Sequence, residues 1–413
     1  LGGLIFDSEF SSETSVISGD DFVPWALSAA GFEALTGQEP PGGVGFQTIQ
    51  QAAGALGVTL PNGILAGDGF HIRAAQEMQS KAIFGQLAWR PTEQWTLSFG
   101  ARANFEDKEA AIVLDCFTPG LACAAAGGSD YTANPERSES DVSPKVSLQY
   151  FPWENLSLFT TYAQGYKSGG FNNLSLTPSG IEVEPEKTES WEVGAKGTLF
   201  GETLSYGVTL FNMDVEDLQL QNFISSTIVL VRNAASARSR GIELDAQWLT
   251  PWQPLSLRAS GALTDAAFKE YPNAPAPRGS GANQDLSGER LPYSPQQQFS
   301  LTPELRFPFD TPELPLLGTR GLVVATALDV NYIGDLFLDG DLDPNVHQDA
   351  YSLMNGRLAL KNATETLSLG LVVENLTDND VLTFTTDSTL FPGGYMGSQQ
   401  TQRNWYLEAR VAW

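Results

Sequence analysis

The chain holds few residues that could perform specific chemistry, and two cysteines are the clearest of them. Cys116 and Cys123 are its only cysteines, and six residues separate them. A two-cysteine metal site needs further ligands, but the only histidines, His71 and His347, have no neighbouring ligand in the sequence. The pair therefore predicts a disulfide that closes a small loop, which requires an oxidising compartment.

A second candidate for chemistry is an acidic run at residues 335–343, with the sequence Asp-Leu-Phe-Leu-Asp-Gly-Asp-Leu-Asp. Carboxylates at this density can bind a hard cation such as calcium. The spacing does not match an EF-hand loop, which has a glycine at its sixth position and a glutamate at its twelfth. A solvated acidic loop is the interpretation that the spacing favours, with calcium binding as the alternative.

Catalytic motifs are missing from the sequence. It contains no Gly-x-Ser-x-Gly elbow, no glycine-rich phosphate loop after a strand and no His-Glu-x-x-His pair. We therefore expect no enzymatic activity, no resident cofactor and no metal centre. The formal net charge of −26 also argues against nucleic acid as a partner, because nucleic-acid binding needs clustered Lys and Arg.

The elements that must position these residues are strands whose side chains alternate between apolar and polar. In the segment 405–413 every odd-numbered residue is apolar, and the even positions hold Tyr406, Glu408 and Arg410. The same period of two recurs at 95–106, 242–248 and 299–307, and we count about fourteen such strands. An aromatic-rich face opposite a charged face is typical of a transmembrane antiparallel β-barrel, an all-β fold with lipid outside and a polar lumen.

The charged positions of these strands share one face and would line the lumen of the barrel. Mutual neutralisation, or contact with a domain that fills the barrel, explains such a mixture of signs better than acid–base catalysis does. The predicted lumen residues are Arg102, Lys196, Glu243, Asp245, Arg258, Glu304, Arg306, Glu408 and Arg410.

Connections between the strands alternate in length, as in barrels with short periplasmic turns and long outer loops. Short turns are predicted at residues 90–94, 151–155, 200–203, 249–254 and 362–366. Long loops are predicted near residues 11–75, 109–139, 168–184, 268–294, 336–348 and 381–398, with a short helix around residues 49–56. Gly241 is expected to end a short hairpin, and Asn375 and Asp378 are expected to cap a turn.

Two further classes of protein are disfavoured by the sequence. No apolar run approaches the roughly 20 residues that a membrane-spanning helix needs. A soluble β-propeller would show a motif that recurs every ~40–45 residues, and none does. The sequence starts within a strand at Leu1 and shows no export signal, so we expect it to be part of a longer chain.

Four stretches resemble the C-terminal part of the barrel of TonB-dependent outer-membrane receptors, and the resemblance covers nearly the whole chain. They are Tyr-Ala-Gln-Gly-Tyr-Lys-Ser-Gly-Gly-Phe-Asn at 162–172, Pro-Glu-Lys-Thr-Glu-Ser-Trp-Glu-Val-Gly-Ala-Lys at 185–196, Asn-Ala-Ala-Ser-Ala-Arg-Ser-Arg-Gly-Ile-Glu-Leu at 233–244 and Val-Glu-Asn-Leu-Thr-Asp at 373–378. The sequence departs from the family at Val381, where a tyrosine is common.

The resemblance implies a barrel of roughly 22 strands, of which residues 1–413 would form one partial barrel domain of about 14 strands. The family's plug domain, which contacts the TonB–ExbB–ExbD complex, and the first strands would lie upstream and outside this chain. Such a receptor would be a monomer in the outer membrane of a Gram-negative bacterium, surrounded by lipid and lipopolysaccharide. It would bind a scarce ligand with its outer loops and import it with energy delivered by TonB.

The expected ligand is a ferric siderophore, while haem, cobalamin and oligosaccharides are the other ligands of the family. Loop aromatics that can stack on a planar chelate or a sugar are the ligand-binding candidates. They are Tyr166, Phe171, Tyr293, Phe384 and Tyr395. Two other classes stay open: a passive porin whose charged lumen sets ion selectivity, and a surface adhesin whose loops bind a partner while nothing crosses.

Overall fold

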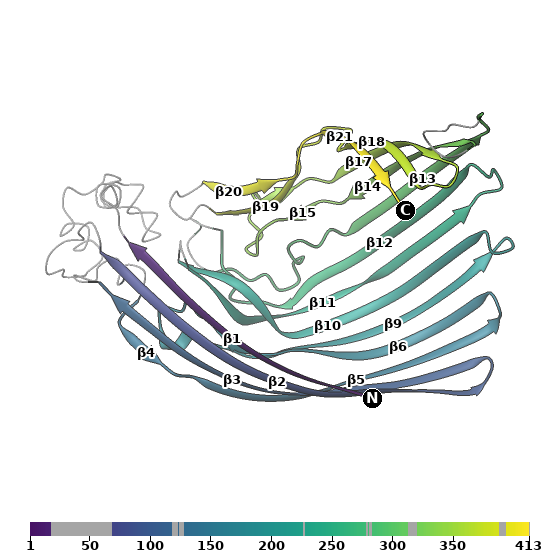
Figure 1. Cartoon of the computed structure of the whole chain (residues 1–413). Coiled ribbons are helices and arrows are strands. Elements are labelled where there is room, and N and C mark those ends of the chain that lie inside the picture. The colour runs from purple at the N-terminus through teal and green to yellow at the C-terminus, as the bar shows by residue number, and fades with distance from the viewer. Residues whose placement is uncertain are drawn as a thin grey trace.

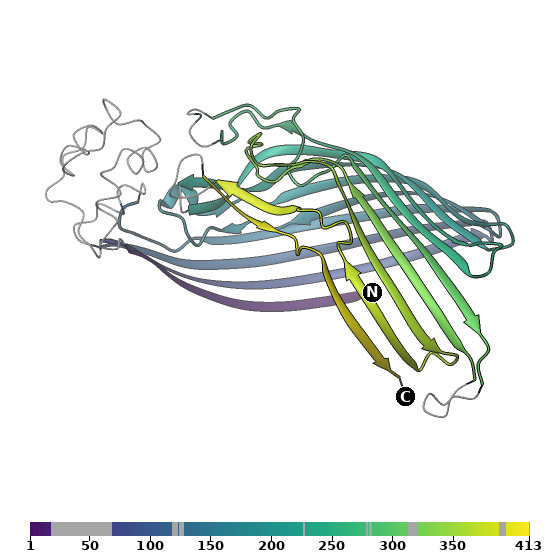
Figure 2. The ribbon, with the colours of Figure 1, turned by 90° about the horizontal axis from the view of Figure 1, so that it is seen from above.

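One curved antiparallel sheet makes up most of the structure, which is a computed structural model (Figures 1 and 2). The structure describes residues 1–17, 68–117, 123, 128–225, 228–277, 280, 283–312, 320–387 and 394–412. The sheet has 15 strands, of which fourteen follow one path in chain order and β4 pairs with β3 beside that path. The prediction of an antiparallel sheet of about fourteen strands is confirmed. Within the described ranges no helix is long and apolar enough to cross a membrane.

The strands of the main path are mostly long. They are β1 (Gly2–Ile17), β2 (Gly69–Thr92), β3 (Trp95–Cys116), β5 (Glu136–Trp153), β6 (Leu156–Lys167), β9 (Glu186–Leu199), β10 (Leu204–Ser225), β11 (Ile228–Leu249), β12 (Leu255–Glu270), β13 (Gln297–Phe309), β14 (Leu322–Ile333), β17 (Tyr351–Asn362), β18 (Leu367–Glu374) and β21 (Asn404–Val411). The shorter elements are β4 (Tyr131–Ala133), β7 (Gly170–Phe171), β8 (Glu182–Val183), β15 (Leu336–Phe337), β16 (His347–Gln348), β19 (Leu382–Asp387), β20 (Tyr395–Gln399) and the 3-10 turn η2 (Pro178–Gly180).

Most of the short connections lie at one end of the sheet and the small hairpins of the long connections lie at the other, as Figure 1 shows; the longer connection 310–321 between β13 and β14 joins strands at the same end as the short ones. The end with the tight hairpins, such as β2–β3 and β5–β6, is called the turn end. The end with the small hairpins β7–β8, β15–β16 and β19–β20 is called the loop end. This arrangement places all of the ligand-binding candidates at the loop end.

The two faces of the sheet differ in character because side chains alternate along each paired strand. The face that carries Trp405, Leu407 and Val411 is called the apolar face, and the opposite face is called the polar face. Pairing of Leu371 with Leu407, and of Leu358 with Leu371, carries the apolar face from strand to strand. Its large apolar side chains are exposed. Surfaces that meet lipid are apolar in this way, whereas surfaces in water rarely expose contiguous apolar patches.

The sheet is open in this chain, because β1 and β21 are its two edges and do not pair with each other. Both edges therefore present unpaired backbone N–H and C=O groups. Such an edge is not tolerated in the hydrocarbon region of a bilayer, where every backbone polar group must have a partner.

Several predicted loop boundaries are wrong, because pairing continues beyond the predicted strand ends. The predicted loop 11–75 begins inside β1 and ends inside β2, and the loop 109–139 begins inside β3. The polar-face side chains of these extensions include Phe70, Ile72 and Leu114, which are buried under the loop end. The residues that cover these side chains are distant in sequence, so the alternation of apolar and polar residues along each strand did not reveal the burial. The helix predicted around residues 49–56 lies outside the described residues.

The expectation for Gly241 is also wrong, whereas the predicted turn at Asn375 and Asp378 is confirmed. Gly241 lies within β11 and pairs with Phe211 and Thr264. A Cβ there would lie 2.2 Å from the Leu263 carbonyl oxygen and 3.0 Å from the Phe211 ring, so the glycine allows a close approach within the sheet. Asn375, at φ 48°, accepts a hydrogen bond from the Asn379 backbone N–H at 3.0 Å and donates to the Asn379 carbonyl at 2.9 Å.

Replacement of Leu244 by lysine tests which face meets lipid. Leu244 lies on the apolar face, and a lysine near the bilayer centre costs about 2–4 kcal/mol of unfolding free energy. We expect a loss of that size in guanidinium unfolding of the intact protein from lipid vesicles. The matched control Ala262→Lys, next to Glu243 on the polar face, should stay within about 0.5 kcal/mol of the parent protein. Equal losses for the two variants would contradict the assignment of the faces.

Candidate functional site: the polar face and the loop end

Registers along the sheet place all of the predicted lumen residues on one face. Lys196 pairs with Gly207, Gly207 with Asp245, and Asp245 with Ser260, and each pair shares a face. The same alternation sets Arg102, Glu243, Arg258, Glu304, Arg306, Glu408 and Arg410 on the polar face. The structure thus brings these charges onto one continuous surface, and their contact with a plug stays a prediction.

Opposite charges are interleaved on the polar face. Glu304 lies 3.5 Å from Arg258 and 3.6 Å from Arg306, while Arg306 also pairs with Glu365. Arg357 on β17 contacts Glu408 on β21 at 2.7 Å, across the intervening strand β18. These side chains are partly exposed, so each pair contributes little to stability. The surface is a row of donors and acceptors that a second body can bind.

Two cations of the polar face lie over aromatic rings. The Arg102 guanidinium is 5.6 Å from the Phe84 ring centroid, and the Lys196 ammonium is 5.2 Å from that of Phe159. Attraction between a cation and a ring face holds such side chains against the wall. Asp245 lies beside Gly207, where an added Cβ would come within 2.5 Å of its Oδ1 atom.

An apolar cluster covers the loop end of β2 and β3 on the polar-face side. It contains Phe70, Ile72, Ala74, Ala110, Ile112 and Leu114 from these strands, with Cys123, Leu176, Ile181 and Leu230. Leu176 and Ile181 come from the connection between β6 and β9, and Leu230 comes from β11. The connection 168–184 therefore reaches across the polar-face side and packs against both groups of strands. It is called the strap below.

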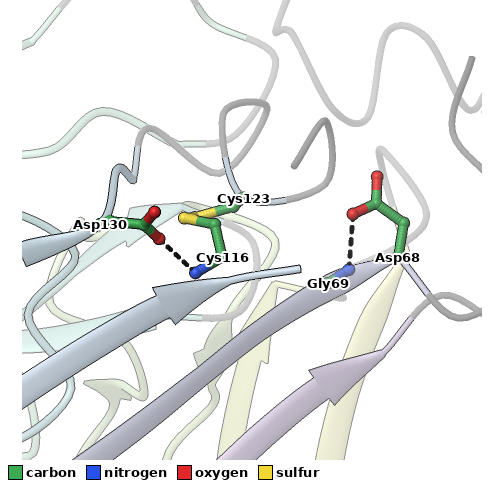
Figure 3. Close-up of a disulfide and its surroundings, with 5 residues drawn as sticks. All are labelled: Asp68, Gly69, Cys116, Cys123 and Asp130. Carbon is green, nitrogen blue, oxygen red and sulfur yellow. Dashed lines mark hydrogen bonds between the residues drawn. A yellow bond between two sulfur atoms is a disulfide. The ribbon is translucent and has the colours of Figure 1, made fainter. Parts of the chain in front are cut away.

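A disulfide and two aspartates shape the chain near this cluster (Figure 3). Cys116, the last residue of β3, is bonded to the buried Cys123. The Asp130 carboxylate accepts a hydrogen bond from the Cys116 backbone N–H at 2.5 Å, and Asp68 accepts one from Gly69 at 2.8 Å. Cys123 packs in the apolar cluster, so the disulfide joins the end of β3 to the core of the loop end.

Side-chain amides attach the strap to β11. Asn172, only 8% exposed, donates to the Val231 and Gly180 carbonyls at 2.9 and 2.8 Å and accepts from the Val231 N–H at 2.9 Å. Asn233 accepts from the Glu184 N–H and donates to the Glu184 carbonyl, each at 2.7 Å. These amides satisfy backbone groups that have no strand partner, as buried backbone requires.

Ion pairs attach the other side of the strap to β3 and β5. Arg137 on β5 pairs with Glu139 and with Glu184 of the strap, and Lys108 on β3 donates to the Gly169 carbonyl at 2.5 Å. The hydrogen bond from Arg137 lowers the pKa of Glu184 below its usual value. The strap is thus fixed at both of its ends.

The connection between β12 and β13 is attached to that between β14 and β17. Arg290 contacts Asp335 at 2.8 Å, and Gln284 donates to the Asp341 carbonyl at 2.6 Å. The hydrogen bond from Arg290 lowers the pKa of Asp335, and His347, 3.3 Å away, acts in the same direction. The predicted acidic run lies here, as turns in which aspartates accept nearby backbone N–H groups. Among the described residues, no group of three or more potential ligands could hold a metal ion.

The aromatic candidates fall into two groups. Tyr166 donates to Glu139 behind the strap, and Phe171 packs against the apolar cluster from the strap itself. Tyr293 and Tyr395 both contact the connection 334–350, through the Leu338 carbonyl at 2.5 Å and Asp343 at 3.0 Å. Phe384 is exposed on β19, the partner of the strand that carries Tyr395. Tyr293 and Tyr395 thus contact the same connection, and Phe384 lies on the hairpin that carries Tyr395, apart from the other two candidates.

Tyr293 has an unusual backbone. Its φ angle of 55° lies in the left-handed region, which a bulky side chain rarely adopts. Its N–H donates to the Phe337 carbonyl at 2.9 Å and its hydroxyl donates to the Leu338 carbonyl, so both ends of the residue are fixed although the residue is 47% exposed. Strain held by such contacts is common at binding sites.

Comparison with known proteins decides the family. A family model described as TonB dependent receptor-like, beta-barrel matches residues 6–376. The chain belongs to the TonB-dependent receptor family. That family is one of outer-membrane barrels that act as receptors and transporters, in agreement with the antiparallel pairing and the two distinct faces described above.

Curated relatives and solved structures agree with this assignment. The pesticin receptor of Yersinia pestis is 22% identical over 311 residues, which cover 74% of this chain and 40% of that protein. The catecholate siderophore receptor Fiu of Escherichia coli K12 is 24% identical over 347 residues, or 80% of this chain and 41% of Fiu. The chain thus spans about two fifths of the length of these relatives.

The fold matches solved receptor barrels. The ferric yersiniabactin uptake receptor FyuA from Yersinia pestis superimposes with a TM-score of 0.66 at 19% identity, covering 83% of this chain and 47% of FyuA. The ferric-catecholate import receptor Fiu in its closed form gives a TM-score of 0.57 at 19% identity, covering 85% of this chain and 46% of Fiu. At this level of identity the match supports the fold.

The attachments of the strap were not predicted from the sequence. Asn172 and Asn233 stand inside the stretches that resemble the family, and Glu184 immediately precedes one, but their roles depend on partners 47 to 59 residues away. The signal available in the sequence is the amide and acidic side chains at these three positions, which lie where the alternation of apolar and polar residues stops.

Replacement of Asn172 by alanine should detach the strap from β11. The substitution removes three hydrogen bonds of a buried amide, each worth about 1 kcal/mol. We expect the protection of strap and Val231 amides against hydrogen exchange to fall by roughly 100-fold, and the strands far from the strap to keep theirs. Asn345→Ala removes one side-chain hydrogen bond, to Asp343 within the same turn, and is the control. Unchanged protection of the strap would show that the apolar cluster alone holds it.

Acid should loosen the connection 334–350. Because the folded pKa of Asp335 is lowered, its pairing with Arg290 stabilises this region fully above the ordinary carboxyl pKa of about 3.9. That stabilisation is lost as the pH falls through the lowered folded pKa. We expect limited proteolysis of this connection by an acid-active protease to accelerate between pH 4 and 2, as an approximate window. The variant Asp335→Asn should show a smaller acceleration across that range, and equal pH dependence in both proteins would contradict the assignment.

Proposed function

We propose that this chain is the C-terminal part of an outer-membrane receptor that binds a ferric siderophore with its outer loops and imports it with energy from TonB. The family match over residues 6–376 carries the proposal. The relatives add weight, since they include receptors named for ferric yersiniabactin uptake and for catecholate siderophores.

The arrangement of the described residues suits this task. The loop end has a fixed wall, made by the strap, and a second region with the exposed aromatics Tyr293, Phe384 and Tyr395. Aromatic rings can stack on the planar groups of a chelate and exclude water from it. We propose that these three aromatics contact the ligand, and that Tyr166 and Phe171 support the strap.

A role for the polar face follows from its charges. Interleaved arginines and carboxylates can hold a polar plug through many weak contacts, none of which is too strong to be released during transport. We propose that the family's plug binds along Arg258, Glu304, Arg306 and Glu408. The inner-membrane partner of that plug would be the TonB–ExbB–ExbD complex.

The decisive experiment is uptake of radioactive iron by the strain that carries the native gene. Deletion of the full-length gene should abolish uptake of one ferric siderophore under iron limitation, and expression of the gene should restore it. Removal of TonB should abolish the restored uptake. Uptake that persists without TonB would favour a passive porin, and normal uptake in the deletion strain would favour an adhesin.

Substitutions at Tyr293 separate two roles for this residue in the full-length receptor. If its ring stacks on the ligand, Tyr293→Ala should weaken the Kd by about 5- to 30-fold, whereas Tyr293→Phe should keep the parent affinity. If the hydroxyl acts only by positioning the loop through Leu338, both variants should bind equally weakly. Phe200→Ala, at the turn end, is the control and should leave the Kd unchanged.

A further inference from the structure

A small apolar groove lies at the turn end, between the turn that joins β9 to β10 and the turn that joins β11 to β12. The two turns are neighbours because β10 pairs with β11. The volume of the groove is about 420 Å³, within the range of roughly 300–1,000 Å³ that is typical of small-molecule sites. The residues that line it are Phe200, Thr203, Trp248, Leu249, Thr250 and Pro251.

The first of these turns holds an uncommon backbone conformation. Phe200, Gly201 and Glu202 have φ angles of 54°, 66° and 69°, so two residues with side chains lie in the left-handed region. The Thr203 hydroxyl donates to the Phe200 carbonyl at 3.0 Å, and the Leu249 N–H donates to the Thr203 carbonyl at 2.8 Å. Phe200 is 72% exposed, so packing in a protein core does not stabilise this conformation. Backbone strain of this kind is common at ligand-binding sites.

The groove continues the apolar face at its border with the turn end. Trp248 lies on the apolar face beside Leu204 and Leu257, its partners in register. Trp252 of the second turn packs against Phe307 with 6.0 Å between the ring centroids, and both side chains are exposed. Aromatic residues at the end of an apolar band mark the level of the lipid head groups. The groove therefore lies where the acyl chains of the periplasmic leaflet meet their head groups.

The two turns, residues 200–203 and 250–254, contain a single charged residue, and it is an acid. Glu202 is exposed and belongs to the same turn as Phe200. A carboxylate at the level of the head groups attracts a lipid that carries an ammonium group and repels a lipid whose head group is a net anion. Aromatic rings attract an ammonium group as well. An ethanolamine head group supplies such an ammonium beside its phosphate.

We propose that this groove binds one phospholipid of the periplasmic leaflet that has an ethanolamine head group, with an acyl chain between Phe200 and Trp248 and the ammonium beside Glu202. Continuity of the groove with the apolar face supports an acyl chain as the occupant, and the charge of Glu202 supports the head group. The left-handed turn fixes Phe200 as one wall of the groove. The proposal rests on the outer-membrane placement of the family and is independent of the imported ligand.

Lipid titration of the purified full-length receptor tests the site. The probes are dioleoyl phosphatidylethanolamine and dioleoyl phosphatidylglycerol, which have the same acyl chains, and native mass spectrometry counts the lipids bound in detergent. The parent protein should bind one ethanolamine lipid on the order of fivefold more tightly than the glycerol lipid, as one partly exposed ion pair provides. Glu202→Gln should abolish this difference. Phe200→Gly should weaken the binding of both lipids by about 10-fold, because it removes one apolar wall of the groove.

Two controls separate lipid binding from a purely structural role. Glycine adopts a φ angle of 54° without strain, so Phe200→Gly should unfold at the same temperature as the parent or at a higher one. Glu154→Gln removes an exposed acid from the turn that joins β5 to β6, and it should leave the binding of both lipids unchanged. The proposal is overturned if the parent binds the two probes equally, if Phe200→Gly binds them like the parent, or if Glu154→Gln reduces the preference for ethanolamine as much as Glu202→Gln does.

Discussion

Hydrogen bonding between neighbouring backbones is the constraint on which the rest of this structure depends. In a bilayer no water is present to satisfy peptide groups, so every strand must be paired along its membrane-spanning length. Pairing fixes the direction of each side chain, and one residue of slip would exchange the two faces. The division between a lipid-facing wall and a charged interior is therefore a property of the whole sheet, and it is transmitted from β1 to β21 through the registers.

That constraint explains which parts of the molecule are readable from the sequence. The alternation of apolar and polar residues at Trp405–Val411 and at Ile242–Trp248 predicted the strands and their two faces. It also predicted the face of each charged lumen residue, because this alternation depends only on neighbours in the chain. Gly241 shows where this reading fails. A glycine inside an unbroken strand looks like the end of a hairpin until the Phe211 ring, thirty positions earlier, is known to lie against it.

The loop end follows a different physical rule. Its residues lack a common period, and their positions are set by individual contacts such as Asn172 with Val231 or Arg290 with Asp335. Amides and ion pairs of this kind satisfy backbone and charge in one arrangement only, and a single sequence does not reveal the partners. The five aromatic candidates were selected from the sequence only because aromatic rings can stack on a ligand. Their tertiary contacts distinguish Tyr166 and Phe171, which contact Glu139 and the apolar cluster, from the other three, which are exposed.

The strap connects two distant parts of the curved sheet and so constrains its curvature. Between β3 and β11 the wall follows an arc of five strand steps, about 24 Å at the usual strand spacing, and the strap joins the two ends of that arc on the polar-face side. A tie of this kind keeps the arc from flattening, so this part of the rim is mechanically stiff. The loop end of the strands from β12 to β21 should deform more easily, because its connections are attached mainly to one another.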